Sequence, residues 1–517
     1  MIAYRQVSRT VSTEEVLEGA GDALTFLMEF GEIEAALVDR LCPDEDSLDP
    51  EVVKLREITR EAGRAFVAGR ALAVDFTDLR LPEQIEISVP EGYAWHALSP
   101  ASYVAPAERF WQERQPRDAV VIGIRGIGSS LSAVVAAALE QHGCRVASYT
   151  VRPQGHPSLR ELRLADDLRQ ALTRTSQAFY VVVDEGPGLS GSSFASVAEA
   201  LSALGIPDHR IVFMPAWLPD GSGFASRGAE ARWRIHTKYA AACARPDDAW
   251  IDLSGGEWRA VFYSDESAYP ATQPQHEAAK FLDRDGLVRF AGLGRYGAEK
   301  LRRARLLADA GFSTRPIAFK DGWLSMEFVR GTPLRIDILD DDLLETMARY
   351  LAFRRQAFGT GESARIADLA EMIRVNLGVR APRPPRTEAT ITDGRMLPHE
   401  WIATAGGYLK TDALDHGDNN FLPGPTDICW DLAGAMFEWQ LEDRERERLL
   451  KRYVRHSGDR RAPDRLPFYV LAYAAFRIGY TKLAIAALPY STDRRRFERL
   501  LEQYLAALDR QEAAAAR

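Results

Sequence analysis

The sequence predicts an α/β domain built on a parallel sheet, followed by a bilobal α+β domain, with a helical segment ahead of both. Residues 118–217 alternate apolar strands with helical patterns, which is typical of a parallel sheet. A stretch rich in Gly, Ser and Pro at 252–275 breaks this rhythm, and two hairpin patterns separated by a helix follow it. The 517 residues suffice for two or three domains. The expected parts are a helical segment at 1–80 that packs on the next domain, the parallel-sheet domain at 81–255, a linker at 256–275, and the bilobal domain at 276–517.

The first part carries helical patterns and no residues that suggest chemistry. Residues 12–41 begin with a Ser/Thr-x-x-Glu start and place apolar residues at helical spacing, and a second helix is expected over about 50–72. Residues 85–93 then alternate as a strand and a turn. We expect this segment to act as a helical cap on the domain that follows.

Composition excludes several classes of protein. The chain is 46% hydrophobic and 27% charged, with a net charge of −9 that argues against a nucleic-acid-binding surface. Its four cysteines lack CxxC spacing, and neither a membrane-spanning run nor a signal peptide is evident. The sequence thus predicts a cytoplasmic protein with small-molecule partners, without nucleic acid or membrane, and leaves a homo-oligomer open.

The most informative stretch runs from Phe179 to Phe194. Five aromatic and β-branched residues end in Asp184 and Glu185, and a run of Gly, Pro and Ser then opens a helical pattern near Ser192. Backbone N–H groups at a helix start suit a phosphate, and two carboxylates at a strand end suit sugar hydroxyls or Mg²⁺. The stretch therefore predicts a site for a ligand that is both a sugar and a phosphate.

This stretch resembles the ribose-phosphate loop of the type I phosphoribosyltransferases. The resemblance implies that Asp184 and Glu185 bind the ribose hydroxyls of phosphoribosyl pyrophosphate together with Mg²⁺, as catalytic and metal-binding residues. The loop is one residue longer than usual, and Gly186-Pro187 replaces two apolar residues. A GxGxxG match over 186–191, a Walker loop and a purely structural Gly-rich turn are the alternatives. The 5′-phosphate would be held by the loop residues Gly188, Ser190, Gly191, Ser192 and Ser193.

Two further strand ends add polar loops to the same edge of the sheet. Arg125, with Gly128 and Ser129, resembles the pyrophosphate loop of that family, and Arg152, His156 and Arg160 resemble its mobile catalytic loop. Their positive charges would stabilise departing pyrophosphate while an oxocarbenium-like centre forms. His156 is the candidate acid or base because histidine titrates near neutral pH.

The second half resembles the aminoglycoside-phosphotransferase-like kinases. The hairpin at 276–290, a helix ending at Gly311 and a second hairpin ending near residue 329 follow the order of the small lobe, with 326–329 as the hinge. No clear strand Lys stands opposite a helix Glu. The nearest candidates for nucleotide-binding residues are Lys280, Arg289, Glu299 and Glu327.

The large lobe of that family presents a catalytic Asp, a polar metal ligand, a short hairpin, a second metal Asp and a Trp-Asp-Leu-Ala helix start. The resemblance implies that Asp412 is the catalytic base and Asp427 a metal ligand, with Asp431 as a structural acid. The usual Asn five residues after the base is absent, because Gly417 occupies that position after Asp412. His416, Asp418 or Asn419 would then replace it, with His416 and Asp418 as the candidate metal ligands.

These resemblances imply a phosphoribosyltransferase that uses phosphoribosyl pyrophosphate and Mg²⁺ on a nucleobase-like acceptor. The kinase-like domain would use ATP to phosphorylate the same metabolite. One alternative is a regulator that senses phosphoribosyl pyrophosphate or a nucleotide without turnover and carries a pseudokinase. The other is a small-molecule kinase whose N-terminal half selects the substrate.

Overall fold

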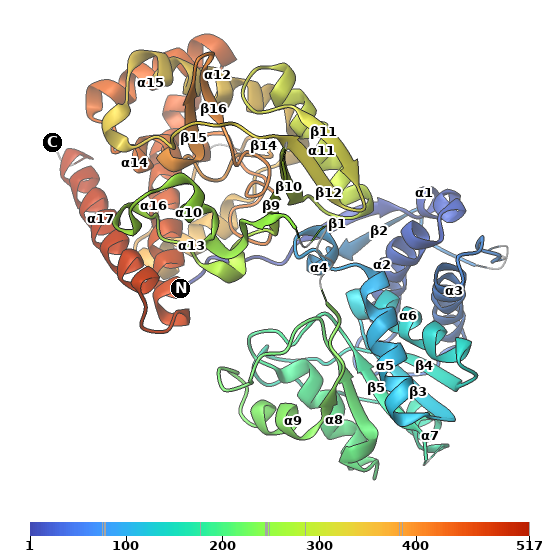
Figure 1. Cartoon of the computed structure of the whole chain (residues 1–517). Coiled ribbons are helices and arrows are strands. Elements are labelled where there is room, and N and C mark those ends of the chain that lie inside the picture. The colour runs from blue at the N-terminus through green and yellow to red at the C-terminus, as the bar shows by residue number, and fades with distance from the viewer. Residues whose placement is uncertain are drawn as a thin grey trace. The chain divides into compact units, whose positions relative to one another are not determined.

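The computed structural model describes residues 1–515 except 75, 77, 78, 176, 243–246, 248, 285, 382 and 385, and omits the side chains of 20, 275 and 511–515. The chain divides into two compact units (Figure 1). The first is Ser8–Pro246, and the second combines Met1–Val7 with Asp247–Arg517. The segment 256–275, predicted to be a linker, therefore lies inside the second unit.

The first unit contains the predicted parallel sheet, with strand order β4-β3-β5-β6-β7. In chain order this is 2-1-3-4-5, so the direction of strand addition reverses between β3 and β5. Ligands of such sheets bind beyond the carboxyl ends of the strands at this switch point. The strands are β3 (Asp118–Ile124), β4 (Arg145–Val151), β5 (Phe179–Val183), β6 (Ile211–Met214) and β7 (Thr237–Lys238).

Helices accompany this sheet, and an N-terminal helical layer packs on one of them, α6. Helices α2 and α3 contact α6, and a Cβ atom on Gly63 of α3 would lie 2.7 Å from the Ala133 carbonyl oxygen of α6, so only glycine permits this approach. The bounds are β1 (Ser8–Ser12), α1 (Thr13–Glu18), α2 (Ala23–Leu41), α3 (Pro50–Val67), β2 (Gln84–Ser88), α4 (Glu91–Ala94), α5 (Val104–Arg114), α6 (Ile127–Gln141), α7 (Asp166–Thr173), α8 (Ser192–Ala203) and α9 (Ala229–Ile235).

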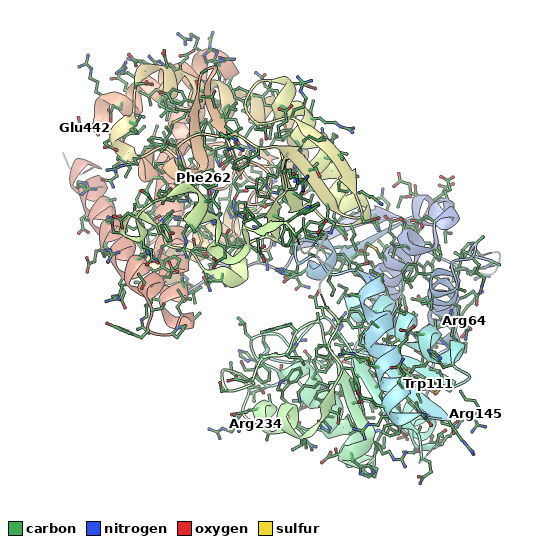
Figure 2. All side chains as sticks on the ribbon, in the orientation of Figure 1. Arg64, Trp111, Arg145, Arg234, Phe262 and Glu442 are labelled. Carbon is green, nitrogen blue, oxygen red and sulfur yellow. The ribbon has the colours of Figure 1, made fainter. Side chains whose placement is uncertain are left out.

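The second unit begins with an antiparallel sheet of order β11-β12-β10-β9-β8. Its hairpins β9–β10 and β11–β12, with α11 between them, confirm the predicted hairpin–helix–hairpin order. Between β8 and β9 the chain forms α10, whose Phe262 (labelled in Figure 2) packs on Phe328 with ring centroids 5.9 Å apart. The bounds are β8 (Ile251–Asp252), α10 (Trp258–Phe262), β9 (Lys280–Leu282), β10 (Gly286–Phe290), α11 (Gly294–Asp309), β11 (Pro316–Lys320) and β12 (Trp323–Glu327).

Helices make up most of the remainder of this unit, around a core that includes the fully buried Trp401, Trp430 and Trp439. A short hairpin, β15–β16, stands among them and precedes Asp412. The elements are α12 (Asp341–Ala357), β13 (Gly359–Ser363), α13 (Ile366–Leu377), β14 (Glu388–Thr390), β15 (Trp401–Thr404), β16 (Gly407–Lys410), α14 (Cys429–Glu438), α15 (Asp443–Ser457), α16 (Ala462–Ala487) and α17 (Thr492–Ala515).

Helix α16 is, among the described residues, the one helix long and apolar enough to cross a membrane by length and composition. It contacts α13, α14 and α17 of the second unit. Its Arg465 and Arg477 are buried in ion pairs with Asp427 and Glu438. Within this unit α16 is therefore a core helix.

The first seven residues add an extended segment to the second unit. The Leu422 N–H donates to the Ala3 carbonyl at 2.8 Å, and the Ile2 N–H donates to Asn376 Oδ1 at the same distance. Ala3 is buried in the core of the unit. This segment was predicted to belong with the helical part at 1–80.

Candidate functional sites

Asp184 and Glu185 lie at the switch point of the parallel sheet, directly after β5. The Gly92 N–H donates to Glu185 Oε2 at 2.7 Å, and the Tyr103 hydroxyl donates to the Asp184 carbonyl at 2.8 Å. Burial raises the pKa of Asp184 to about 6. Burial and the adjacent Asp184 charge raise the pKa of Glu185 to about 8. A Mg²⁺ ion or a proton would relieve this crowding of negative charge.

The loop after β3 approaches this acid pair, as predicted. A Cβ atom on Gly128 would lie 2.8 Å from the Val183 carbonyl oxygen and 3.5 Å from Asp184 Oδ1. Ser129 is fully buried, and its Oγ has no hydrogen-bond partner among the described residues. The start of α6 therefore stands directly beside the carboxylates.

Arg125 does not face this site, which corrects its predicted role in binding pyrophosphate. Its buried guanidinium forms ion pairs with Asp46 and, at 2.8 Å, with Asp39, and it donates to the Thr150 carbonyl at 3.2 Å. Asp39 and Asp46 come from the N-terminal helical layer, so that layer neutralises a charge that the sequence appeared to offer to a ligand.

Arg152 also pairs with Asp39, at 2.6 and 3.0 Å, but remains partly exposed. With Gly126 it lines a cavity of about 160 Å³. Arg160 is half-buried, forms no ion pair with a described carboxylate, and lies near enough to Arg152 and Asp184 to interact with their charges. Arg160 is thus the predicted cation that stays available beside the acid pair.

His156 is exposed, and its Nδ1 accepts a hydrogen bond from the Ser158 N–H at 3.2 Å. No described contact joins it to Asp184 or Glu185. Its predicted acid–base role therefore stays a prediction.

The predicted phosphate loop surrounds the N-terminus of α8. Gly191 adopts φ +67, and a Cβ atom there would lie 2.5 Å from the Phe224 ring. Ser190 Oγ and Ser192 Oγ lie 2.9 Å apart, and Ser192 Oγ donates to the Pro157 carbonyl at 2.5 Å. Ser193 occupies the first turn of α8, and Gly188 is exposed. The loop is therefore joined to the segment that carries Arg160.

A larger cavity, of about 1220 Å³, lies in the second unit between its sheet and its helices. The chain that continues from β12, predicted as the hinge, lines it, as do the ends of the hairpin β15–β16 and parts of α16 and α17. The polar residues that line it include Lys280, Arg289, Glu327, Arg395, Glu400 and Asp412.

Glu400, Asp412 and His416 bring one ligand atom each to within 4.8 Å of one another. Glu400 immediately precedes β15, and Asp412 follows β16 by one residue, so the hairpin itself positions both acids. Two carboxylate oxygens and an imidazole nitrogen suit a divalent cation such as Mg²⁺, Mn²⁺ or Zn²⁺. This donor set fits the metal that the resemblance implies.

The electrostatics of the cluster also suit a metal. Burial, opposed by Lys410 at 2.8 Å, raises the pKa of Glu400 to about 7. Burial and the charge of Arg395 lower the pKa of His416 to about 4, which keeps the imidazole neutral and able to ligate. Although burial opposes it, the contact of Asp412 with His416 at 3.2 Å holds the pKa of Asp412 well below its usual value.

Three predicted roles in the second half are corrected by these positions. Asp412 follows the hairpin β15–β16, whereas the catalytic Asp of the resembled family precedes its hairpin, so the position does not match the predicted base. Asp427 is buried in an ion pair with Arg465 at 2.6 Å and does not line the cavity. Asp418 pairs with Arg303 at 2.7 Å, outside the cluster.

Three of the four predicted nucleotide-binding residues line the cavity, and the fourth does not. Lys280, Arg289 and Glu327 line the cavity, and Arg289 lies 3.4 Å from Asp412. Glu299 instead pairs with Arg302 on the exposed surface of α11, which corrects its predicted role. The cations Lys300 and Arg303 of α11 face the acidic loop, paired with Asp415 and Asp418.

Asp431 is the structural acid that the sequence predicted. Its carboxylate accepts the backbone N–H groups of Asp393 and Gly394 at 2.7 and 2.9 Å. It thereby fixes the loop that leads to Glu400. Glu400 and Arg395 were missed by sequence reasoning, although the alternating residues 401–410 with a Gly-Gly turn could have revealed the hairpin that Glu400 precedes.

No family model matches the chain, and no curated protein matches it. Among solved structures, a choline/ethanolamine kinase family protein from Mesorhizobium loti is 18% identical and covers 48% of this chain and 97% of its own, with a TM-score of 0.30. A choline kinase from Cryptosporidium parvum Iowa II is 10% identical over 46% of this chain and 87% of its own, with a TM-score of 0.32. A spectinomycin phosphotransferase solved with ADP and spectinomycin is 10% identical over 45% and 89%, with a TM-score of 0.30. At these TM-scores the likeness assigns no activity to this chain.

Proposed function

We propose that the second unit is a metal-dependent phosphotransferase that moves a phosphoryl group from ATP to a small molecule. The observation that carries this proposal is the convergence of Glu400, Asp412 and His416 in one cluster, of which Glu400 and Asp412 line the cavity. Phosphoryl transfer depends on positioning and on cations that neutralise the phosphates. A divalent ion on these ligands would supply that charge, with Arg289 and Lys280 beside it.

The cavity also offers room for a nucleotide and an acceptor together. Its volume of about 1220 Å³ exceeds that of an ordinary small-molecule site. Residues 326–329 line it at the end of β12, where a base could form hydrogen bonds with the backbone as it does at a kinase hinge. The adenine would lie there, with the phosphates directed toward the metal ligands.

Calorimetric titration of the full chain with a non-hydrolysable ATP analogue tests this proposal, with Mn²⁺ or Mg²⁺ present. We expect metal-dependent binding that Glu400→Gln and Asp412→Asn each weaken by at least about tenfold, since each removes a charged ligand. Asp337→Asn is the matched control, because Asp337 lines the same cavity but pairs with Arg335 at an exposed position. Binding that needs no metal, or that survives both cluster variants, would refute the proposal.

A second activity, phosphoribosyl transfer, is proposed for the first unit. The specific observation in its favour is the convergence of Asp184, Glu185, Gly128 and Arg160 at the switch point. The acids would bind the ribose hydroxyls and Mg²⁺, and the start of α8 the 5′-phosphate. Because Arg125 is paired internally, positive charge on the leaving pyrophosphate would come from Arg160 and Mg²⁺.

Titration of phosphoribosyl pyrophosphate with Mg²⁺, on the wild type and on an Asp184→Asn/Glu185→Gln double variant, tests this second proposal. Tight binding that the variant loses would support it, whereas equal binding by both proteins would exclude the site. A sensor without turnover would bind the ligand but release no pyrophosphate with any nucleobase. A kinase that uses its first half only to select substrate would keep consuming ATP in Asp184→Asn and lose that activity in Asp412→Asn.

A further inference from the structure

The loop between β14 and β15 places an arginine beside the proposed metal ligands. Arg395 lies one residue after Gly394, whose N–H is held by Asp431, and five residues before Glu400. It lines the same cavity as Glu400 and Asp412. Asp431 thus holds the backbone next to Arg395, and the Arg395 residue itself lines the cavity.

The guanidinium of Arg395 has no carboxylate partner among the described residues. Its one ring contact is Tyr480, whose centroid lies 6.0 Å away. Burial acts most strongly on the pKa values of His416, Glu400 and Glu277, and the Arg395 charge favours a lower pKa in each of them. The guanidinium therefore lies close to the proposed metal ligands. Tyr480 also forms a hydrogen bond with Arg395, and Glu400 and Glu277 act on its charge without forming an ion pair with it. A guanidinium that lines a cavity and contacts no described carboxylate can bind an anion.

The position of Arg395 is that of the catalytic base in the kinase pattern. There, an Asp accepts the proton of the acceptor hydroxyl, and the metal-binding Asn follows five residues later. Here Glu400 takes the place of that Asn, ahead of the hairpin, and Arg395 takes the place of the Asp. A guanidinium cannot accept a proton, so this position supplies no base. The ring of His399, in the same loop, is stacked on Trp258 with centroids 5.8 Å apart.

Neighbouring carboxylates do not replace the missing base. The Asp393 side chain is fully buried and contacts Tyr350 and, at 3.2 Å, Lys410. Although burial opposes it, Lys280 at 2.9 Å holds the pKa of Glu277 below its usual value. Glu438 forms an ion pair with Arg477 at 2.8 Å. Glu400 and Asp412 are the proposed metal ligands.

We propose that the acceptor is itself an anion, a carboxylate or a phosphate monoester, whose charged oxygen is held by Arg395 and attacks the γ-phosphorus of the bound ATP. This inference rests on the proposed phosphotransferase function. A bond forms between that oxygen and the γ-phosphorus, the bond to the bridging oxygen breaks, and the electron pair leaves with ADP. No proton is lost by the acceptor, so no base is needed. The product is an anhydride, either an acyl phosphate or a diphosphate.

The test supplies ATP labelled in its γ-phosphate, with Mg²⁺ or Mn²⁺, to the full chain and matched acceptors. The probes are glycerol, glycerate and glycerol 3-phosphate, and ribose, ribonate and ribose 5-phosphate. We expect label only in the acids and phosphates, as an anhydride: an acyl phosphate is cleaved by neutral hydroxylamine, and a diphosphate shows phosphorus–phosphorus coupling in NMR spectra. These two readouts also distinguish the two anionic acceptors.

Variants of Arg395 complete the test. Arg395→Gln should retain ATP binding and lose transfer by about 100-fold or more, as expected when a charge-assisted contact to the reacting group is lost. Arg395→Lys should lose less, and Arg335→Gln, on the rim of the same cavity, should leave transfer unchanged. Label in an ester of glycerol or ribose, transfer unaffected by Arg395→Gln, or bound ATP with no label in any probe would each overturn the inference. Failure of ATP itself to bind in a preceding titration would instead remove the phosphotransferase function, and this inference with it.

Discussion

Glu400 and Asp412 stand at opposite ends of one hairpin, the first just before β15 and the second just after β16. Because the two strands are antiparallel, the ends of the hairpin meet, and residues twelve positions apart in sequence become neighbours. The two carboxylates of the proposed metal site are therefore brought together by this local pairing.

Metal binding should depend on pH through Glu400. Burial, against the opposing charge of Lys410, raises the pKa of this carboxyl to about 7, so at pH 6 most molecules carry a proton that a metal must displace. We expect affinity for Mn²⁺ to fall about tenfold per pH unit below 7 and to level off above about pH 8. Calorimetry at pH 6, 7 and 8 measures this slope. Glu400→Gln should bind weakly at every pH, and an equally steep slope in that variant would show that another group titrates.

Asp427 should matter for stability and not for metal binding. It shares the buried guanidinium of Arg465 with Asp459, at 2.6 and 2.7 Å. We expect Asp427→Ala to lower the free energy of unfolding by about 3 kcal/mol, because a buried charge loses a partner. Urea denaturation measures the loss. Mn²⁺ affinity, measured below the denaturation transition, should equal that of the wild type, and a loss of affinity without a loss of stability would restore Asp427 as a ligand.

Arg125 and Arg160 should separate stability from ligand binding in the first unit. Arg125→Gln leaves Asp39 and Asp46 short of a buried partner and should cost about 3–5 kcal/mol. Arg160→Gln removes no ion pair, so stability should change by no more than about 0.5 kcal/mol, while affinity for phosphoribosyl pyrophosphate falls about tenfold. Thermal denaturation and calorimetry measure the two effects. Arg163→Gln, at an exposed position nearby, serves as the control.

Gly191 and Gly188 form a matched pair in the proposed phosphate loop. Alanine at Gly191 meets both a positive φ and the Phe224 ring, whereas a Cβ atom at Gly188 enters open space. We expect Gly191→Ala to cost more than about 1 kcal/mol and to abolish binding of the 5′-phosphate, with Gly188→Ala close to neutral. Melting temperature and phosphoribosyl pyrophosphate binding report the two results. Equal behaviour of the two variants would separate the loop from the phosphate site.

The elements that sequence reasoning predicted well are those set by local pattern. The strand Phe179–Val183 is a run of aromatic and β-branched residues bounded by charge and glycine, and its parallel pairing follows from the helices on either side. The hairpin–helix–hairpin order of the second unit was also predicted from local sequence pattern. Asp184 and Asp412 each follow a strand end, and a binding role for either stays a prediction.

The predicted roles that were wrong concern charges, because pattern does not reveal the partner of a charge. Arg125 looked available in the sequence, but its acids lie about eighty positions upstream, Asp39 in α2 and Asp46 in the loop after it. Asp427 stands in a motif-like setting, yet a guanidinium 38 positions away takes both of its oxygens. Asp412 was predicted to be the base because the hairpin was expected after it. The hairpin instead precedes Asp412, which is the position of the proposed metal ligand.

The burial of Ala3 beside Leu422 has a consequence for biosynthesis. Ala3 belongs to a core whose other members, from Ala291 onward, are all made after the whole first unit. The first unit, whose residues are contiguous from 8 to 246, has its whole sequence available while the second is still being translated. The second unit, by contrast, can bind its segment Met1–Val7 only after the residues near 376 and 422 have been made.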